Sequence, residues 1–269
     1  GARSFAAARQ AAVQALCPGS DIAALLDKPN NNLAVEYCKA IIEQNVEMQP
    51  IALPRQGADH GQALTESAHA AFASASALRA LWAEGGAAAL APYVPEKALK
   101  LYKQAEYDGK YTDFAVMGHC ELALLRAACA GQAPFAAVRG VSEGLEHRLE
   151  NAVRETASLP TLLDALTTVR YPRARMRRLA MDAALGYTAQ TPALPPYLHL
   201  LGARKEALSL PGETALPLSH SLARLARENE SCAQMAAAQS RASDLGALCR
   251  AKPEPMGGIY RQKIIFLTN

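Results

Sequence analysis

Long alanine-rich stretches run through this chain, and glycine and proline rarely interrupt them. Because alanine has the highest helix propensity, helix should dominate the secondary structure. The first two apolar patterns, Phe5 to Leu16 and the short run after Asp21, both have helical spacing. No strand pattern precedes them, whereas an α/β domain normally begins with a strand and its phosphate-binding turn. The sequence therefore predicts a mostly helical protein.

The charge balance excludes a nucleic-acid footprint spread over the whole surface. The formal net charge is only +3 over 269 residues. Any contact with nucleic acid must therefore come from local clusters of arginine or lysine.

The cysteines and histidines predict neither disulfides nor structural zinc. The six cysteines include no Cys-x-x-Cys pair and most lie in apolar helical patterns, so we expect buried, reduced thiols of a cytoplasmic protein. The six histidines never fall in a metal-ligand spacing, so no metal site is expected. No apolar run approaches membrane-spanning length, so we expect no membrane partner.

A short serine-rich turn has the chemistry of a phosphate receptor. Ser74 and Ser76 precede Arg79 at the start of a helix in which Leu78 and Leu81 recur at helical spacing. Free backbone N–H groups, the positive end of the helix dipole and a guanidinium group all suit an anion. The alternative is an ordinary N-capped surface helix.

Three asparagines, Asn30 to Asn32, stand before a helix with Leu33, Tyr37 and Ile41 on one face. Asparagine there is capping chemistry, and one cap uses one side chain. The remaining amides are free to contact another group such as a nucleotide. The alternative is a polar turn that leads into a helix.

The run from Met48 to Leu53 predicts a weak strand that ends at Arg55 and Gln56. Ligands of open α/β sheets bind beyond the carboxyl ends of strands. A glycine-containing loop then leads to the serine turn. On this interpretation Asn30, Arg55 and Arg79 face one crevice.

Consecutive helices are expected beyond Gly85-Gly86. Val141 to Val153 reads as one helix with Gly144 inside it, which we attribute to close packing rather than to a close ligand. Ser158 should cap another helix. Near the end, strands at Leu198 to Leu201 and Ile264 to Leu267 are expected to pair.

The densest positive charge surrounds a helix that should begin at Pro172 and stop at Gly186. Asp182 is expected within reach of Arg178 on this helix. Arginines facing phosphates would make affinity fall steeply with salt. The alternative is a solvated helix face. The five arginines are Arg170, Arg173, Arg175, Arg177 and Arg178.

These segments, taken in order, resemble the bacterial tRNA(Met) cytidine acetate ligases of the nucleotidyltransferase superfamily. The likeness covers most of the chain, and the ordered series is more specific than any one piece. The matching segments are Pro29-Asn30-Asn31 with Leu33 and Glu36 to Ala40, Arg55 with Gly57-Ala58, Ser74 to Arg79, Val141 to Leu149, Arg170 to Arg175, and Tyr197 with Leu201-Gly202.

The resemblance implies an enzyme that activates acetate with ATP and Mg²⁺ and passes the acetyl group to N4 of the wobble cytidine of elongator tRNA(Met). It implies a partial Rossmann-like nucleotidyltransferase part at residues 1–85 and a mainly helical tRNA-binding domain with a few short strands at residues 86–269. The residues implied to contact ATP are Asn30, Asn31, Arg55, Gln56, Ser74, Ser76 and Arg79. The residues implied to contact tRNA are Arg170, Arg173, Arg175, Arg177 and Arg178.

One departure from the family pattern matters for activity. Family members open with a strand and a His-x-Gly-His turn that grips the triphosphate, and this sequence contains no such motif. We therefore expect a fragment without its catalytic first half, inactive in adenylation. No general base is identified, since His60 reads as a plain loop histidine.

Two other functions stay open at this point. One is a helical tRNA-binding module without catalysis. The other is a nucleotidyltransferase for a small phosphate ester that uses the same serine turn, although such an enzyme would have little use for the long helical half.

Overall fold

The computed structural model describes residues 5–53, 73–209 and 214–267. The chain divides into two compact units, residues 1–84 and 85–269. The described residues are mostly helical with a few short parallel strands, so the predicted helical character is confirmed. The identities predicted for the two halves, a partial nucleotidyltransferase domain and a tRNA-binding domain, stay predictions.

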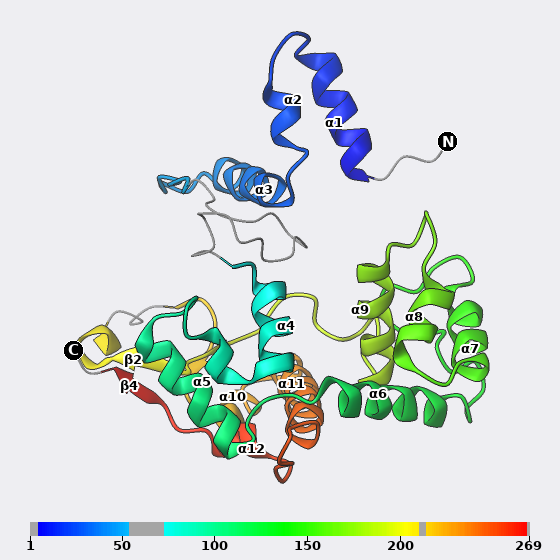
Figure 1. Cartoon of the computed structure of the whole chain (residues 1–269), viewed down its shortest axis with the longest axis vertical. Helices are drawn as coiled ribbons and strands as arrows, with labels where there is room; N and C mark the ends of the chain where they lie inside the picture. Colours follow the sequence, from blue (N-terminus) through cyan, green and yellow to red (C-terminus); the bar gives the residue numbers. More distant parts are fainter. Residues whose placement is uncertain (1–4, 54–72, 210–213, 268–269) are drawn as a thin grey trace. The chain divides into compact units, whose positions relative to one another are not determined.

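The N-terminal unit is described as helices joined by turns (Figure 1). Its first two predicted helices are confirmed, and they pack against each other. Ala23 and Leu26 are the buried apolar residues among its described parts. The helices are α1 (Phe5–Leu16), α2 (Ile22–Leu25), α3 (Pro29–Glu43) and α4 (Ala75–Gly85).

The predicted asparagine cap of α3 is wrong. The helix begins at Pro29, and the capping position is held by Lys28, whose side chain makes no capping hydrogen bond. Proline suits the first helical position because it lacks the N–H that would need a partner there. The asparagines thus lie inside the first turn, where Asn32 Nδ2 donates to the carbonyl of Leu26 at 2.6 Å.

The predicted strand from Met48 to Leu53 is also wrong. The segment has no regular secondary structure, and Met48, Ile51 and Leu53 are all exposed. A strand needs a partner for its backbone groups, and Pro50 offers no N–H to one. Met48 to Leu53 therefore provides no strand end for Arg55, and Arg55 itself lies outside the described residues.

The C-terminal unit contains most of the regular structure. Its helices are η1 (Ala87–Leu90), α5 (Glu96–Asp108), α6 (Phe114–Ala128), α7 (Leu145–Glu155), α8 (Leu159–Leu166), α9 (Arg173–Ala184), η2 (Lys205–Ser209), α10 (Leu222–Leu225), α11 (Glu230–Leu248) and α12 (Gly258–Arg261). Its strands are β1 (Leu198–His199), β2 (Gly202–Arg204), β3 (Leu218–Ser219) and β4 (Ile265–Leu267).

Helices α6 to α9 share the larger hydrophobic core (Figure 1). Leu125, Leu149, Leu162 and Met176 come from the four helices in turn, and all are fully buried. The core also encloses Phe135 from the connection between α6 and α7. This cluster fixes the positions of α7 and α9, which carry the polar groups considered below.

The capping chemistry of α8 confirms its predicted start. The hydroxyl of Ser158 accepts a hydrogen bond from the backbone N–H of Thr161 at 3.3 Å. Helix α9 likewise follows Pro172, and Gly186 just beyond its end has φ of +69°, as predicted from the proline and glycine.

Gly144 lies before α7 rather than inside the predicted helix. It is the N-cap residue, with φ of +79°. A Cβ built on Gly144 would meet no atom within 4 Å, so close packing is not the reason for glycine here. The reason is the left-handed backbone, which glycine adopts without steric cost.

The strands form two separate parallel pairs, and the predicted pairing is only partly right. β1 pairs with β3, and β2 pairs with β4 through Gly202 opposite Ile265. The C-terminal strand therefore pairs with residues 202–204 rather than with Leu198 to Leu201. One hydrogen bond, from Ile265 N–H to the carbonyl of Leu201 at 3.1 Å, reaches the predicted partner.

All six cysteines lie in the described residues as free thiols. Cys17 and Cys38 are exposed, so the predicted burial is wrong for these two. No described helix is both long and apolar enough to cross a membrane.

Candidate functional site

The serine turn forms the first turn of α4. The hydroxyl of Ser74 accepts from the backbone N–H of Ala77 at 3.2 Å and lies 3.1 Å from the hydroxyl of Ser76. Ser74 is buried, whereas Ser76 and Arg79 are exposed. Residues three apart share one side of a helix. The turn thus presents a hydroxyl and a guanidinium on the same side of the helix start.

The other predicted ATP contacts come from separate parts of the chain. Asn30 is exposed and Asn31 is half-buried in the first turn of α3. Arg55 and Gln56 lie outside the described residues, as does His60. The convergence of these side chains with the serine turn on one ligand stays a prediction.

Three of the five clustered arginines have partners within the protein. Arg170 forms an ion pair with Glu143, and Arg173 forms one with Asp164. The guanidinium carbon of Arg175 lies 5.2 Å from the ring centre of Tyr171. These contacts hold the three side chains near the start of α9.

Arg177 and Arg178 are exposed and make no hydrogen bond or ion pair with the described residues. The predicted contact between Arg178 and Asp182 is wrong, because Asp182 instead pairs with Arg139 at 3.0 Å. Two cations of α9 are therefore available to an external anion without breaking an internal ion pair.

A buried carboxyl group lies close to Arg177. Glu121 on α6 is 1% exposed, and its Oε1 has no hydrogen-bond partner among the described residues. Burial raises the pKa of this carboxyl from its ordinary 4.5 to about 7, while the positive charge of Arg177 lowers it. Sequence reasoning missed Glu121 because nothing local marks one glutamate of an apolar helix as buried.

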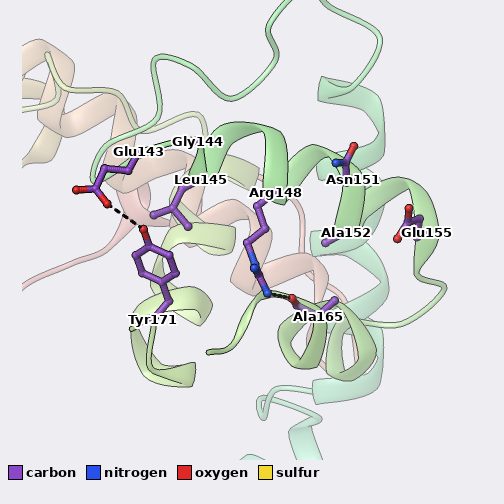
Figure 2. A pocket seen from close by; sticks show the side chains of 9 residues that line it. All are labelled: Glu143, Gly144, Leu145, Arg148, Asn151, Ala152, Glu155, Ala165 and Tyr171. Atoms are coloured by element: carbon purple, nitrogen blue, oxygen red, sulfur yellow. Dashed lines mark hydrogen bonds between the residues drawn. The ribbon is translucent and has the colours of Figure 1, made fainter. Parts of the chain in front are cut away.

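A groove of about 440 Å³ runs along α7, where Figure 2 shows its lining. Glu143 and Tyr171 point toward each other at one end, with 3.5 Å between the tyrosine hydroxyl and Glu143 Oε2. Arg148 reaches across to donate to the carbonyl of Ala165 at 2.6 Å. Further along α7, the lining continues with Asn151 and Glu155.

Sequence reasoning noticed Tyr171 but did not predict this groove. The spacing of Arg148, Asn151 and Glu155 puts all three on one side of a helix, which was a usable signal. The opposite wall comes from Ala165 of α8 and from Tyr171, which precedes α9, and no local pattern indicates that contact.

The family model that describes HIGH Nucleotidyl Transferase matches residues 2–257. The chain belongs to this family. Among curated relatives, the tRNA(Met) cytidine acetate ligase of Listeria monocytogenes serotype 4b (strain CLIP80459) is 30% identical over 183 residues. The ligase of the same name from Geobacillus sp. (strain WCH70) is 28% identical over 185 residues. The resemblance to these ligases is thus confirmed.

The alignments cover 67% and 66% of this chain, respectively, and 45% of each relative. The chain spans about half the length of the curated relatives that it matches. A crystal structure of Thermotoga maritima TmcAL bound with alpha-thio ATP matches 99% of this chain and 67% of that chain. Its TM-score is 0.81 at 20% identity, which shows a shared fold.

Proposed function

We propose that this chain carries part of the machinery of an ATP-dependent ligase. The reaction forms acetyl-adenylate from acetate and ATP with Mg²⁺, and then acetylates N4 of the wobble cytidine in elongator tRNA(Met). Family membership and the names of the curated relatives support this proposal. The observation in the chain itself that carries it is the serine turn of α4.

The serine turn suits the chemistry of adenylation. When acetate attacks the α-phosphate, pyrophosphate leaves and negative charge develops on phosphate oxygens, so fixed donors are needed rather than a side-chain nucleophile. Ser76, Arg79 and the remaining free N–H groups of the first turn of α4 provide such donors. In the proposal Asn30, Asn31, Arg55, Gln56 and Ser74 complete the ATP contacts.

The proposal assigns no complete adenylation site to this chain alone. The sequence has no His-x-Gly-His turn, and helix α3 leaves Leu33 and Tyr37, which are four residues apart on one face, exposed. Exposed side chains of this size on one helix indicate a face without its packing partner. The proposed ATP site thus lacks the His-x-Gly-His turn that grips the triphosphate in family members.

Incubated with acetate, ATP and Mg²⁺, the purified chain is expected to release no pyrophosphate above the buffer rate. The reason is that the serine turn alone cannot position the attacking carboxylate against the α-phosphate. A coupled pyrophosphate assay measures this, with the Listeria relative as the active control. Release by the chain at a rate near that of the control would contradict the proposal.

We further propose that α9 and the segment just before it contact the tRNA backbone through Arg170, Arg173, Arg175, Arg177 and Arg178. Arg177 and Arg178 should contribute most, because they form no ion pair with the described residues, whereas Arg170 and Arg173 do. A binding module without catalysis is the second candidate function, and these two cations favour it. RNA binding by a chain that releases no pyrophosphate is what that candidate requires.

Replacing both residues, Arg177→Ala/Arg178→Ala, should weaken tRNA binding and flatten its salt dependence. Loss of two phosphate contacts lowers the slope of log affinity against log salt by about 2. Binding titrations at several salt concentrations measure the slope, and thermal unfolding checks that the variant is folded.

The matched control is Arg224→Ala/Arg227→Ala, which removes two exposed arginines from a different part of the same unit. An equal effect of both double variants would mean that α9 attracts RNA only through overall charge. An unchanged slope in the α9 variant would remove Arg177 and Arg178 from the interface.

A further inference from the structure

Two cysteine side chains from distant segments meet in the C-terminal unit. Cys120 lies in the second turn of α6, and Cys249 is the C-terminal capping residue of α11. A hydrogen bond joins the two thiols, so their sulfur atoms are in contact. Both thiols are free in the structure. The fold therefore places two reduced sulfurs where a bond between them could form.

Backbone contacts hold the two segments together around this pair. The N–H of Asp113, the N-cap residue of α6, donates to the carbonyl of Cys249 at 2.8 Å. The N–H of Ala251 donates to the carbonyl of Tyr111 at 3.0 Å. Helices α6 and α11 lie beside each other here (Figure 1). The sulfurs are thus brought together by fixed backbone rather than by a chance meeting of flexible side chains.

The two thiols differ in their access to solvent. Cys249 is 0% exposed, whereas Cys120 is half-buried. Burial and the hydrogen bond with Cys120 raise the pKa of the Cys249 thiol above its ordinary value, so this sulfur stays protonated. A small oxidant therefore reaches Cys120 first and finds Cys249 beside it as a resolving thiol.

We propose that Cys120 and Cys249 form a reversible disulfide when the protein meets a peroxide. The Cys120 thiolate attacks one oxygen of hydrogen peroxide, the O–O bond breaks, and the departing hydroxide takes the proton lost by the thiol and leaves as water. The Cys249 sulfur then attacks the resulting sulfenic acid, and the S–O bond breaks. The second hydroxide leaves as water with the proton of Cys249. The two thiols together lose two electrons, which reduce the peroxide to water.

The disulfide would join two packed parts of the C-terminal unit. Helix α6 contributes Leu122 and Leu125 to the larger hydrophobic core, and α11 contributes Cys232 and Ala236 to a smaller one. A cross-link that closes a loop of about 130 residues removes much of the chain entropy of the unfolded state. The oxidised chain should therefore unfold at a temperature about 5–15 °C above that of the reduced chain.

Peptide mapping after peroxide treatment tests the proposal. The full chain carries Cys17→Ser/Cys38→Ser, which removes two exposed thiols, and it is treated with hydrogen peroxide. Remaining thiols are then blocked with N-ethylmaleimide, and trypsin digestion without reductant releases residues 111–126 and 242–250, with one cysteine each. The two peptides should appear as one species about 2 Da lighter than their sum, since two hydrogens are lost, and dithiothreitol should separate them.

The control variants separate this pair from general thiol oxidation. Cys129→Ser removes another half-buried thiol at the end of the same helix, and it should leave the linked species intact. Cys120→Ser should abolish both the linked species and the rise in unfolding temperature. Cys249→Ala removes the same bond from the buried side. Thermal unfolding of each reduced variant shows whether it has folded.

The outcomes decide between the disulfide and its alternatives. Linked peptides 111–126 and 242–250 that disappear in Cys120→Ser support the proposal. Oxygen added to Cys120 without a link overturns it, as does a link from Cys120 to a cysteine other than Cys249. A linked chain that unfolds no higher than the reduced chain overturns the stabilising cross-link. All of these measurements are made without RNA, so their results leave the proposed function as it stands.

Discussion

Glu121→Gln is expected to remove the contribution of Glu121 to the pH dependence of the free energy of unfolding. In the native protein the free energy of unfolding should fall by about 2–3 kcal/mol between pH 5 and pH 8 on account of Glu121. In the variant this contribution should vanish, because glutamine does not titrate. Urea unfolding at both pH values measures the difference.

The sign follows from the direction of the pKa shift. Burial raises the pKa of Glu121 from 4.5 to about 7, so in that window the folded chain holds a proton that the unfolded chain has lost. The stabilising contribution of Glu121 is therefore fully present below about pH 4.5 and is lost as the pH rises through 7. Comparison of two pH values also cancels any constant cost of placing an amide at this site.

Glu228→Gln is the matched control, since Glu228 is an exposed glutamate in a turn of the same unit. Its substitution should leave the difference between pH 5 and pH 8 unchanged. If Glu121→Gln keeps the native pH dependence, Glu121 is not the buried titrating group.

Phe135→Ala is expected to lower the free energy of unfolding by about 3–5 kcal/mol. Phe135 is 1% exposed, and it packs in the core that α6 to α9 share. Truncation removes its transfer free energy and leaves a cavity that surrounding helices fill only partly. Denaturant unfolding monitored by circular dichroism measures the loss.

Phe114→Ala provides a control with identical chemistry. Phe114 starts α6 and is 71% exposed, so its truncation should cost less than about 1 kcal/mol. Similar losses for the two phenylalanines would show that Phe135 does not contribute to the core as described.

Local sequence signals predicted the helices well. The helix from Phe5 to Leu16, the serine cap of α8 and the proline and glycine that bound α9 are all confirmed. Each depends on residues within one or two turns of each other, which is the range over which capping and periodicity act.

The predictions that were wrong concern features that a local sequence pattern does not determine. At α3 both Pro29 and the asparagines favour a helix start, and the proline takes the first helical position. A glycine at position 144 is compatible with a helix interior and with a left-handed cap. Its φ of +79° shows that it forms the cap. The run after Met48 has strand composition, but a strand also needs a distant partner.

In the candidate sites too, contacts between neighbours in the sequence could be predicted, and contacts between distant segments could not. Ser74, Ser76 and Arg79 form a turn because they are neighbours in sequence, and this much could be predicted. The groove joins Glu143 to Tyr171 and Arg148 to Ala165, which are contacts between different segments. Likewise, no local rule indicates that Asp182 pairs with Arg139 rather than with Arg178.

The pairing of β2 with β4 depends on the packing of Leu222 and Leu225 of α10 in a smaller hydrophobic core. It joins Gly202 to Ile265 through strands of three residues each, and α10, α11 and α12 lie between them. Closing a loop of about 60 residues costs roughly 3–4 kcal/mol in chain entropy. A few backbone hydrogen bonds at about 1 kcal/mol each barely offset that cost. The small sheet therefore assembles only once packing around α10 has drawn its two ends together, and it separates when that packing is lost.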